Sequence, residues 1–477
     1  MENQDQIWSY VERKAEPMIG LSDAVWDVPE LNYGEFASCA LHKNALEAQG
    51  FRVTTNVGGL PTAVMGEAGA GGPVIAILGE YDALPGLSQA AGEATHTPLP
   101  GDGSGHGCGH NLLGSAALLA ATAVKDWLAE TGAPGRVRYY GCPAEEGGAG
   151  KGFMVREGVF DDVDIAITWH PAHFAGVFPA ASLANQIIDF TFTGRASHAA
   201  AAPHLGRSAL DAAELMNVGV NYMREHMLPS SRIHYAYQDA GGVAPNVVQS
   251  RTVIRYTVRA TELDELLRLT ARVRKIADGA ALMTETTVSS AVLSGMANLL
   301  GNATLEHVLQ ANLERLGPPQ FDEADRAFAR SIRESLTPED IAAPFVAACL
   351  PIDPEKPLCD AILPYRSDSF RTMMGSTDVG DVSWVVPTAQ ALGATCAIGT
   401  PFHTWQMTAQ GKSPLAHKGM VHVAKAMAGT AIDVLRDETL LARVKREHAE
   451  KVAKTPYVSP IPPDVQPPLV VRAVQAA

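Results

Sequence analysis

The sequence lacks the features of disulfide-rich and of membrane-spanning proteins. Its six cysteines among 477 residues are scattered and include no Cys-x-x-Cys pair, which makes a poor disulfide framework and suits a reducing compartment. The polar, acidic N-terminus does not resemble a signal peptide. No apolar run approaches the ~18 residues that a transmembrane helix needs. We therefore expect a soluble, cytoplasmic protein.

An excess of positive charge is also missing. With 37 Lys and Arg against 52 Asp and Glu, the formal net charge is −15, which argues against nucleic acid or an anionic membrane as a partner. The chain has no Gly-x-Ser-x-Gly, P-loop, Gly-x-Gly-x-x-Gly or His-Glu-x-x-His motif, so nucleotide-binding and His-Glu-x-x-His zinc-protease classes gain no support. The 46% hydrophobic content is that of a globular protein, and the length suggests about two to three domains.

The first 184 residues alternate between apolar strand patterns and helical patterns. We expect strands at 73–78, 135–140 and 163–169 and a buried helix at 112–128. Short apolar strands separated by helices predict an α/β fold, with a mixed, mostly parallel sheet flanked by helices. Glu80 and Asp82 then lie at the carboxyl end of the first strand, where ligand and catalytic groups collect in such sheets.

The pattern changes near residue 185, where polar and apolar residues begin to alternate. Strands are expected at 186–192, 232–238, 252–259 and 284–292, with helices at 208–227 and 263–277. This β-α-β-β-α-β order predicts a ferredoxin-like α+β domain at 185–293, inserted between two parts of a larger domain at 1–184 and 294–477. Residues 317–372 are expected to form an insertion with short helices, and the Pro-rich stretch 455–468 suggests disorder.

Residue types that bind metals gather in four stretches. They are Cys108, His110, Glu145, Glu146, His170 and His403. The glycine between Cys108 and His110 permits close backbone approach, and successive strand ends bring Asp82, the glutamates and His170 to one side. Thiolate, imidazole and carboxylate ligands suit zinc or manganese. We therefore predict a metal centre, which holds two divalent ions if Cys108 or a water bridges them.

Glu145 and Glu146 suit two different roles, because neighbouring side chains on an irregular segment point in different directions. One can bind metal, while the other accepts a proton from the metal-activated water and passes it to a leaving amine. An acidic surface turn is the simpler explanation for most such pairs. Here the preceding buried strand and the following Gly-Gly favour the catalytic interpretation.

Alternatives to this ligand set remain open. The competing histidines are His106, His173, His417 and His422. Cys108 could instead be a nucleophile with His110 as its base, although a spacing of two residues makes that geometry awkward and leaves Glu145 without a purpose.

Two stretches of the inserted domain carry candidate substrate groups. His198 follows a predicted strand, in a turn of small residues. Asn246 and Arg259 are thirteen residues apart and could jointly hold a substrate carboxylate, Arg259 through a bidentate fork.

Taken together, the motifs resemble those of the M20 metallopeptidase/amidohydrolase family, in the same order. The matching motifs are Gly-Glu-Tyr-Asp-Ala-Leu-Pro (79–85), Gly-Cys-Gly-His (107–110), Pro-Ala-Glu-Glu-Gly (143–147), Trp-His-Pro (169–171), Ser-His (197–198), Gly-Gly…Asn (241–246) and Phe-His (402–403). The resemblance covers nearly the whole chain and is to the branch with a Cys-x-His pair. The segment 375–384 resembles the group of that branch that hydrolyses p-aminobenzoyl-glutamate.

This resemblance implies a dinuclear-metal, aminopeptidase-like catalytic domain with two Mn²⁺ or Zn²⁺ ions. Cys108 would bridge the ions, His110 and His170 would bind one of them, and Glu146 and His403 the other. The inserted domain would be both a lid and a dimer interface.

The resemblance also implies roles in catalysis. Glu145 would be the general base, and Asp82 would orient the site. His198 would reach into the active site of a partner subunit to stabilise the oxyanion, and Asn246 and Arg259 would hold the carboxylate of the substrate.

Two positions depart from the family pattern. Asn111 stands where many relatives carry aspartate, so the surroundings of the ligands can differ. Glu80 stands where peptidase members place a metal-binding histidine, and we do not count it as a ligand.

The expectation is therefore a metal-dependent hydrolase of N-acyl or N-aroyl amino acids, with p-aminobenzoyl-glutamate as the favoured substrate. Other N-acyl amino acids, auxin conjugates and dipeptides are alternatives within this class. A partner subunit with little activity alone, or a binding scaffold, is the alternative outside it, although a scaffold has no need of a free Glu145. We expect a homodimer through the lid or a heteromer with a related subunit, and no nucleic-acid or membrane partner.

Overall fold

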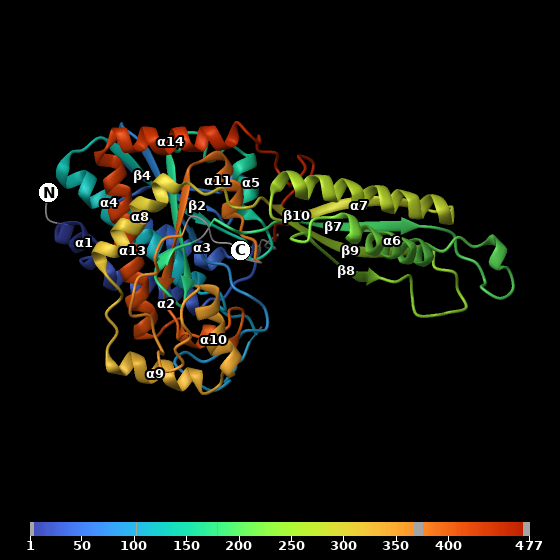
Figure 1. Cartoon of the computed structure of the whole chain (residues 1–477), viewed down its shortest axis with the longest axis horizontal. Coiled ribbons are helices and arrows are strands. Elements are labelled where there is room, and N and C mark those ends of the chain that lie inside the picture. Colours follow the sequence, from blue (N-terminus) through green and yellow to red (C-terminus); the bar gives the residue numbers. More distant parts are fainter. Residues whose placement is uncertain (1–3, 102, 179, 367–374, 471–477) are drawn as a thin grey trace, which may run out of the picture.

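The computed structural model describes residues 4–101, 103–178, 180–366 and 375–470. A large body surrounds one sheet, and a smaller, elongated part built on a second sheet projects from it (Figure 1). This architecture confirms the predicted α/β fold with an inserted α+β unit. The limits proposed for the domains, 1–184, 185–293 and 294–477, stay predictions.

The sheet of the body has seven strands in the order β1-β2-β4-β3-β5-β11-β6. They are β1 (Arg52–Thr55), β2 (Val64–Ala70), β3 (Val74–Glu80), β4 (Gly135–Cys142), β5 (Ile165–Ala172), β6 (Gly176–Val177) and β11 (Thr388–Ala394). The four central strands, β4, β3, β5 and β11, run parallel, and the outer pairs are antiparallel. The sheet is thus mixed. Three of its four parallel strands lie where the sequence predicted them, and the fourth, β11, was not predicted.

Helices cover both faces of this sheet. They are α1 (Gln4–Glu12), α2 (Ala15–Trp26), α3 (Phe36–Ala48), α4 (His110–Thr131), α5 (Gly150–Arg156), α8 (Ala303–Leu316), α9 (Glu323–Arg333), α10 (Pro338–Ala347), α11 (Val379–Val385), α12 (Trp405–Gln410), α13 (Pro414–Arg436) and α14 (Glu438–Val452). Helices α9 and α10 lie within 317–372, where short helices were expected. Short 3₁₀ turns occur at η1 (Val57–Gly59), η2 (Pro203–Leu205) and η3 (Arg224–His226).

Strand β3 shows why helices are needed on both faces of the sheet. All seven of its residues are buried. Successive side chains of a strand point to opposite faces of the sheet, so both faces must be covered. Ile75 and Ile77 belong to the apolar cluster that includes α4 and α13. Ala76 and Leu78 belong to the cluster that includes α5 and α11. A strand buried on both faces reads as a continuous apolar run, which is the pattern used to predict it.

Helix α4 is long and apolar enough, by length and composition, to cross a membrane, and it is the one such helix among the described residues. However, 83% of its most apolar window is buried inside the protein. It packs against α13, α2 and β3. These contacts are those of a core helix.

The second sheet has the order β10-β7-β9-β8, and every neighbouring pair is antiparallel. Its strands are β7 (Ala184–Thr193), β8 (Arg232–Asp239), β9 (Arg251–Ala260) and β10 (Thr287–Met296), and its helices are α6 (Ala209–Met223) and α7 (Leu263–Thr284). The chain order β-α-β-β-α-β with this strand order confirms the ferredoxin-like prediction. We call this projecting part the lid, after the role that the family resemblance implies for it.

The Pro-rich C-terminal stretch is ordered against the body and the lid, so the suggestion of disorder at 455–468 is wrong. Tyr457 donates a hydrogen bond to Asp381 at 2.7 Å, and the carbonyl oxygen of Pro460 accepts one from Gln186 of the lid at 2.5 Å. Ile461 is only 1% exposed. The proline content gave a disorder signal because it excludes helix and strand, yet an irregular segment can still bury apolar side chains.

Candidate metal centre

The carboxyl ends of three parallel strands deliver the acidic and imidazole side chains to one edge of the sheet. Strand β3 ends at Glu80, β4 is followed by Glu145 and Glu146, and β5 contains His170. Glu80 pairs in register with Cys142, the last residue of β4. Parallel strands place their carboxyl ends together, so these residues converge as the sequence predicted.

The Cys108–His110 pair reaches this edge through a loop that ends at the start of α4. Gly109 has φ +76°, and a Cβ atom there would lie 3.0 Å from Pro171 Cγ and 3.1 Å from Met407 Cε. Glycine alone fits this crowded, left-handed position without strain. As a result, the side chains of Cys108 and His110 both turn toward the strand ends.

A first ligand group consists of Cys108, His110 and His170, whose Sγ and ring nitrogen atoms all lie within 4.8 Å of one another. The Cys108 Sγ is 3.4 Å from His170 Nε2. The His170 Nδ1 lies 2.9 Å from the carbonyl oxygen of Pro171, so Nδ1 carries the proton and donates. The lone pair of Nε2 is therefore free to bind a metal.

A second group shares Cys108 with the first and adds Glu146 and His403, again within 4.8 Å. The His403 Nε2 is 3.3 Å from Glu146 Oε1. The backbone N–H of His403 donates to the carbonyl oxygen of Gly107 at 2.9 Å, which ties this loop to the one that carries Cys108. His403 is 53% exposed, so the second group opens to solvent.

Asp82 holds a ligand of each group. Its Oδ1 lies 2.8 Å from His110 Nδ1, and its Oδ2 accepts the backbone N–H of Glu146 at 2.8 Å. The first contact fixes the ring orientation of His110 and leaves Nε2 for a metal. These two contacts are those expected of a residue that orients the site.

Glu145 is buried, with 8% exposure, and forms a further cluster with His110 and Glu80. Burial, followed by the charges of Glu80 and Glu146, raises the pKa of Glu145 well above its usual value. Glu146 behaves differently, because its contacts with His403 and His110 outweigh burial and lower its pKa. The two neighbouring carboxylates thus have the distinct environments expected of a base and a ligand.

The donor set fits divalent metal ions. The His110 Nε2 and Glu146 Oε1 atoms are buried. Each faces a possible ion-pair partner at 3.3 Å, Glu80 Oε2 and His403 Nε2 respectively, but neither atom makes a hydrogen bond among the described residues. Such atoms are costly unless a ligand satisfies them. Burial raises the pKa of the Cys108 thiol. A thiolate here needs a positive charge beside it, and a coordinated metal ion supplies one.

Lys151 and Asp378 adjoin this centre and were missed in the sequence. The Lys151 Nζ lies 2.5 Å from Glu80 Oε1 and 2.6 Å from Asp378 Oδ1, and the Lys151 side chain is 0% exposed. Lys151 therefore pairs with Glu80 through Oε1. Glu80 Oε2 lies 3.3 Å from His110 Nε2, and Glu80 forms with His110 and Glu145 a third group that could hold a metal ion. Leaving Glu80 out of the ligand set stays a prediction. The available signal was the acidic segment 375–384, noted for its resemblance but not assigned a role.

The competing histidines have other partners. The His106 Nε2 lies 3.1 Å from the carbonyl oxygen of Val25, and the His173 Nε2 lies 2.8 Å from that of Thr400. His417 pairs with Asp23, and His422 with the carbonyl oxygen of Gly317. None of the four belongs to a ligand group found among the described residues.

Asn111 points away from the centre. Its Nδ2 donates to Ser22 Oγ at 3.0 Å and to the carbonyl oxygen of Gly411 at 3.0 Å. Its side chain therefore joins α4 to α2 and to the end of α12, and it does not tune the ligands directly.

The predicted substrate-binding residues of the lid are not all brought together within one subunit. His198 and Asn246 lie in the loops 194–208 and 240–250, which adjoin through the His198–Val247 bridge at the far end of the lid (Figure 1). Arg259 lies eight residues along β9 from its start and donates to Ser376 at 3.1 Å, near the body. Asn246 and Arg259 therefore lie in different parts of the lid.

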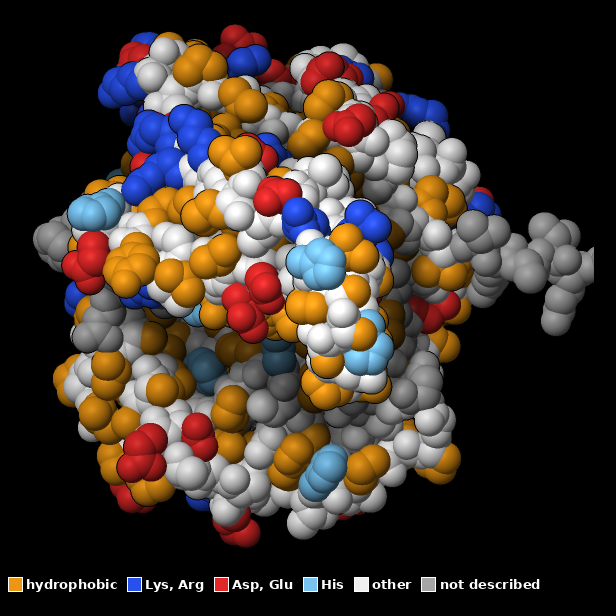
Figure 2. Space-filling model, turned by 90° about the vertical axis from the view of Figure 1, so that its right-hand side faces the viewer, with side chains coloured by type: hydrophobic (Ala, Val, Ile, Leu, Met, Phe, Trp, Pro, Cys, Tyr) orange, Lys and Arg blue, Asp and Glu red, His pale blue; other side chains and the backbone are white. Residues whose placement is uncertain are grey.

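The proton of His198 can be placed. Its Nδ1 accepts the backbone N–H groups of Ala200 at 3.2 Å and Ala201 at 3.1 Å, so the proton resides on Nε2. Figure 2, which views the molecule from the lid end, shows histidine side chains on the lid surface and others recessed below it. The His198 side chain is exposed, so its Nε2 N–H is an accessible hydrogen-bond donor.

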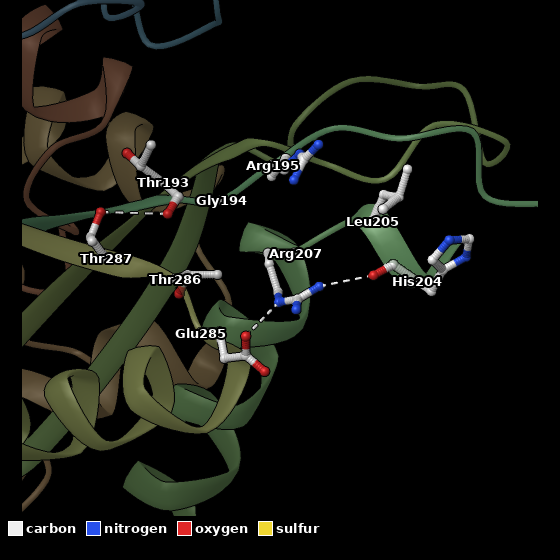
Figure 3. Close-up of a pocket in the computed structure, with 9 residues that line it drawn as sticks. All are labelled: Thr193, Gly194, Arg195, His204, Leu205, Arg207, Glu285, Thr286 and Thr287. Carbon is white, nitrogen blue, oxygen red and sulfur yellow. Dashed lines mark hydrogen bonds and ion pairs between the residues drawn. The ribbon is translucent and has the colours of Figure 1, made fainter. Parts of the chain in front are cut away.

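A separate hollow of about 410 Å³ lies on the lid, lined by Arg195, Arg207 and neighbouring residues (Figure 3). Arg207 is held by Glu285 at 2.9 Å. No predicted ligand or substrate residue lines this hollow. It therefore plays no part in the metal centre.

The chain is similar to known peptidases and hydrolases in sequence and in fold. The model of peptidase family M20/M25/M40 matches residues 76–406. The chain is 48% identical to a subunit of the p-aminobenzoyl-glutamate hydrolase of Escherichia coli (strain K12), over 94% of this chain and 95% of that protein. It is 31% identical to the Xaa-Arg dipeptidase of Mus musculus, over 92% of this chain and 90% of that protein.

Its fold resembles a dinuclear metal-binding peptidase of the M20 family from Bacillus subtilis. The TM-score is 0.58 at 18% identity, with 89% of this chain and 99% of the other covered. With the family model matching well over half of the sequence, the chain belongs to peptidase family M20/M25/M40 and is a hydrolase.

Proposed function

We propose that the protein hydrolyses the amide bond of p-aminobenzoyl-glutamate and releases p-aminobenzoate and glutamate. The observation that carries the reaction is the buried Glu145 beside two ligand groups that share Cys108. The 48% identity with a p-aminobenzoyl-glutamate hydrolase subunit supports the substrate. Hydrolysis of dipeptides is the second candidate, favoured by the 31% identity with an Xaa-Arg dipeptidase.

Two divalent ions, Mn²⁺ or Zn²⁺, would be held by the two groups, with Cys108 common to both. When bound, they would acidify a water molecule and polarise the amide carbonyl. The fit rests on the thiolate, imidazole and carboxylate donors of Cys108, His110, His170, Glu146 and His403.

The side chains of the protein would supply the remaining chemistry. Glu145 accepts the proton of the attacking water and delivers it to the leaving amine, whose bond to the carbonyl carbon breaks. His198 of the partner subunit donates its Nε2 proton in a hydrogen bond to the developing oxyanion. Arg259, with Asn246 of the partner subunit, binds the carboxylate of the glutamate.

We propose that the lid is the dimer interface, because His198 is exposed in a loop at the far end of the lid, where it could reach the metal centre of a partner subunit. A heteromer with a related subunit is the alternative, supported by the similar Escherichia coli protein, which is itself one subunit of its hydrolase. We also propose a cytoplasmic location, supported by six cysteines that are all free, five of them buried.

The test is hydrolysis of a panel of substrates by the purified protein as isolated, after chelation, and after addition of Mn²⁺ or Zn²⁺. The panel contains p-aminobenzoyl-glutamate, other N-acyl amino acids, an auxin conjugate and dipeptides. We expect cleavage of p-aminobenzoyl-glutamate that chelation abolishes and metal restores. Metal-dependent cleavage of another panel member instead would identify that compound class as the substrate. Absence of all cleavage with metal bound would point to a missing subunit.

A further inference from the structure

The segment that carries Glu145 and Glu146 is an irregular turn, residues 143–149, which we call the carboxylate turn. It lies between β4 and α5, so regular hydrogen bonding does not fix it. Ala144 has φ +59° and Ala149 has φ +57°, a left-handed conformation that is uncommon for residues other than glycine. Such a conformation persists only where the surroundings impose it.

Residues 32–35, which we call the anchoring segment, supply those surroundings. Glu35 is 0% exposed, and its Oε1 accepts the backbone N–H of Ala144 at 2.9 Å. This contact holds the strained residue that directly precedes Glu145. Burial, followed by the charge of Asp82, raises the pKa of Glu35 to about 8. A neutral carboxylic acid at this position still accepts the hydrogen bond.

Two further side chains of the anchoring segment hold the other end of the turn. Asn32 Nδ2 donates to the carbonyl oxygen of Glu146 at 2.7 Å, and the Tyr33 hydroxyl donates to that of Gly148 at 2.6 Å. A Cβ atom on Gly148 would lie 2.9 Å from Tyr33 Cε2. The absence of a side chain there lets Tyr33 approach the turn.

We propose that Asn32, Tyr33 and Glu35 are positioning residues that set the carboxylate of Glu145 for proton transfer and that of Glu146 for metal binding. This inference rests on the proposed function of the turn. Their hydrogen bonds to the turn are made with its backbone, so they act through Glu145 and Glu146. A displacement of about 1 Å in a catalytic group can cost roughly 10²-fold in rate.

The decisive variants are Glu35→Ala and Glu35→Gln, assayed with p-aminobenzoyl-glutamate. We expect Glu35→Ala to lower kcat by about 10–100-fold and to change KM by less than about 2-fold. Glu35→Gln should restore most of kcat, because the amide oxygen can accept the N–H of Ala144 and the neutral group resembles the protonated acid.

Glu30→Ala is the matched control. Glu30 is near the anchoring segment, but its carboxylate accepts the N–H groups of Ala37 at 2.9 Å and Ser38 at 2.8 Å, at the start of α3. Its loss should lower the unfolding temperature and leave kcat within about 2-fold. Equal losses of kcat in Glu30→Ala and Glu35→Ala would reduce Glu35 to a structural role and overturn the inference.

A second readout does not depend on activity. In the Co²⁺-loaded protein, Asn32→Ala should shift the visible absorption bands, because Glu146 loses the anchor on its carbonyl oxygen. Glu30→Ala should leave the bands unchanged. If Glu35→Ala does not fold, Asn32→Ala becomes the deciding variant. Unchanged absorption bands together with an unchanged kcat in Asn32→Ala would overturn the inference. If the wild-type protein is inactive but Asn32→Ala still shifts the bands, the result counts against the proposed function alone.

Discussion

The buried ammonium group of Lys151 offers the sharpest test of how this centre is held together. Lys151 contacts Glu80 and Asp378 at 2.5 and 2.6 Å, and the three side chains are 0–3% exposed. Burial by itself would lower the pKa of Lys151, but Asp378 and Glu80 outweigh it and hold that pKa well above the usual value. The group is therefore charged at all ordinary pH values.

Lys151→Met should leave two buried carboxylates without their cation. Removal of one partner of a buried ion pair costs about 3–5 kcal/mol, which is a factor of roughly 10²–10⁴ in the unfolding equilibrium. The measurement is urea denaturation at pH 7, followed by circular dichroism. Lys445→Met is the control, because Lys445 pairs with Asp164 at 2.5 Å but is 54% exposed. We expect that change to cost less than about 1 kcal/mol.

The pH dependence gives a second check. In the wild type, burial would raise the pKa of Glu80, but Lys151 and His110 lower it. This ionised carboxylate contributes stability above its unfolded pKa, and the contribution is lost as pH falls through the lower folded pKa. Without Lys151, burial dominates and the folded pKa lies above the unfolded one. The deficit of Lys151→Met should therefore grow as pH rises from the unfolded pKa of Glu80 toward its raised folded pKa.

Two results would refute this reasoning. One is a loss of stability in Lys151→Met no larger than in the Lys445 control. The other is a deficit that does not change with pH. The double variant Lys151→Met with Asp378→Asn should recover part of the lost stability, since it removes one of the two uncompensated charges.

Three further predictions concern the reaction and the tail. Glu145→Gln should lower kcat by about 10²–10⁴-fold with unchanged metal content by elemental analysis; unchanged kcat would exclude Glu145 as the base. His198→Ala should also be inactive, and mixing its subunits with those of Glu145→Gln should regain about a quarter of wild-type activity; no recovery would remove the cross-subunit role. Ile461→Ala should cost about 2–5 kcal/mol in urea denaturation, against almost nothing for Val458→Ala, whose side chain is 55% exposed.

Periodicity was sufficient to predict the central fold. The continuous apolar run of β3 and the alternating pattern of β7 have direct physical causes, burial on two faces and on one. Strand β11 was missed because its sequence, Thr-Ala-Gln-Ala-Leu-Gly-Ala, is rich in small residues and has little β-propensity. Its parallel partner β5 makes it a strand. Tertiary context therefore overrides propensity at this position.

The candidate ligands could be chosen from the sequence because their residue types are scarce and follow strand ends. Choosing between His170 and His173, or between His110 and His106, required the backbone carbonyls that His173 and His106 contact. Such contacts join residues 81 and 227 positions apart. No local pattern encodes them.

The sequence by itself determined the α/β class, the inserted ferredoxin-like unit, the metal-ligand types and the pair of glutamates, because periodicity and residue chemistry are local properties. Only the tertiary structure decided that Lys151 pairs with Glu80, that Asp82 joins two candidate ligands, and that residues 32–35 hold the carboxylate turn. Each of these depends on burial of polar groups against partners that are distant in the chain. Satisfying buried charges and hydrogen bonds is a property of the packed fold.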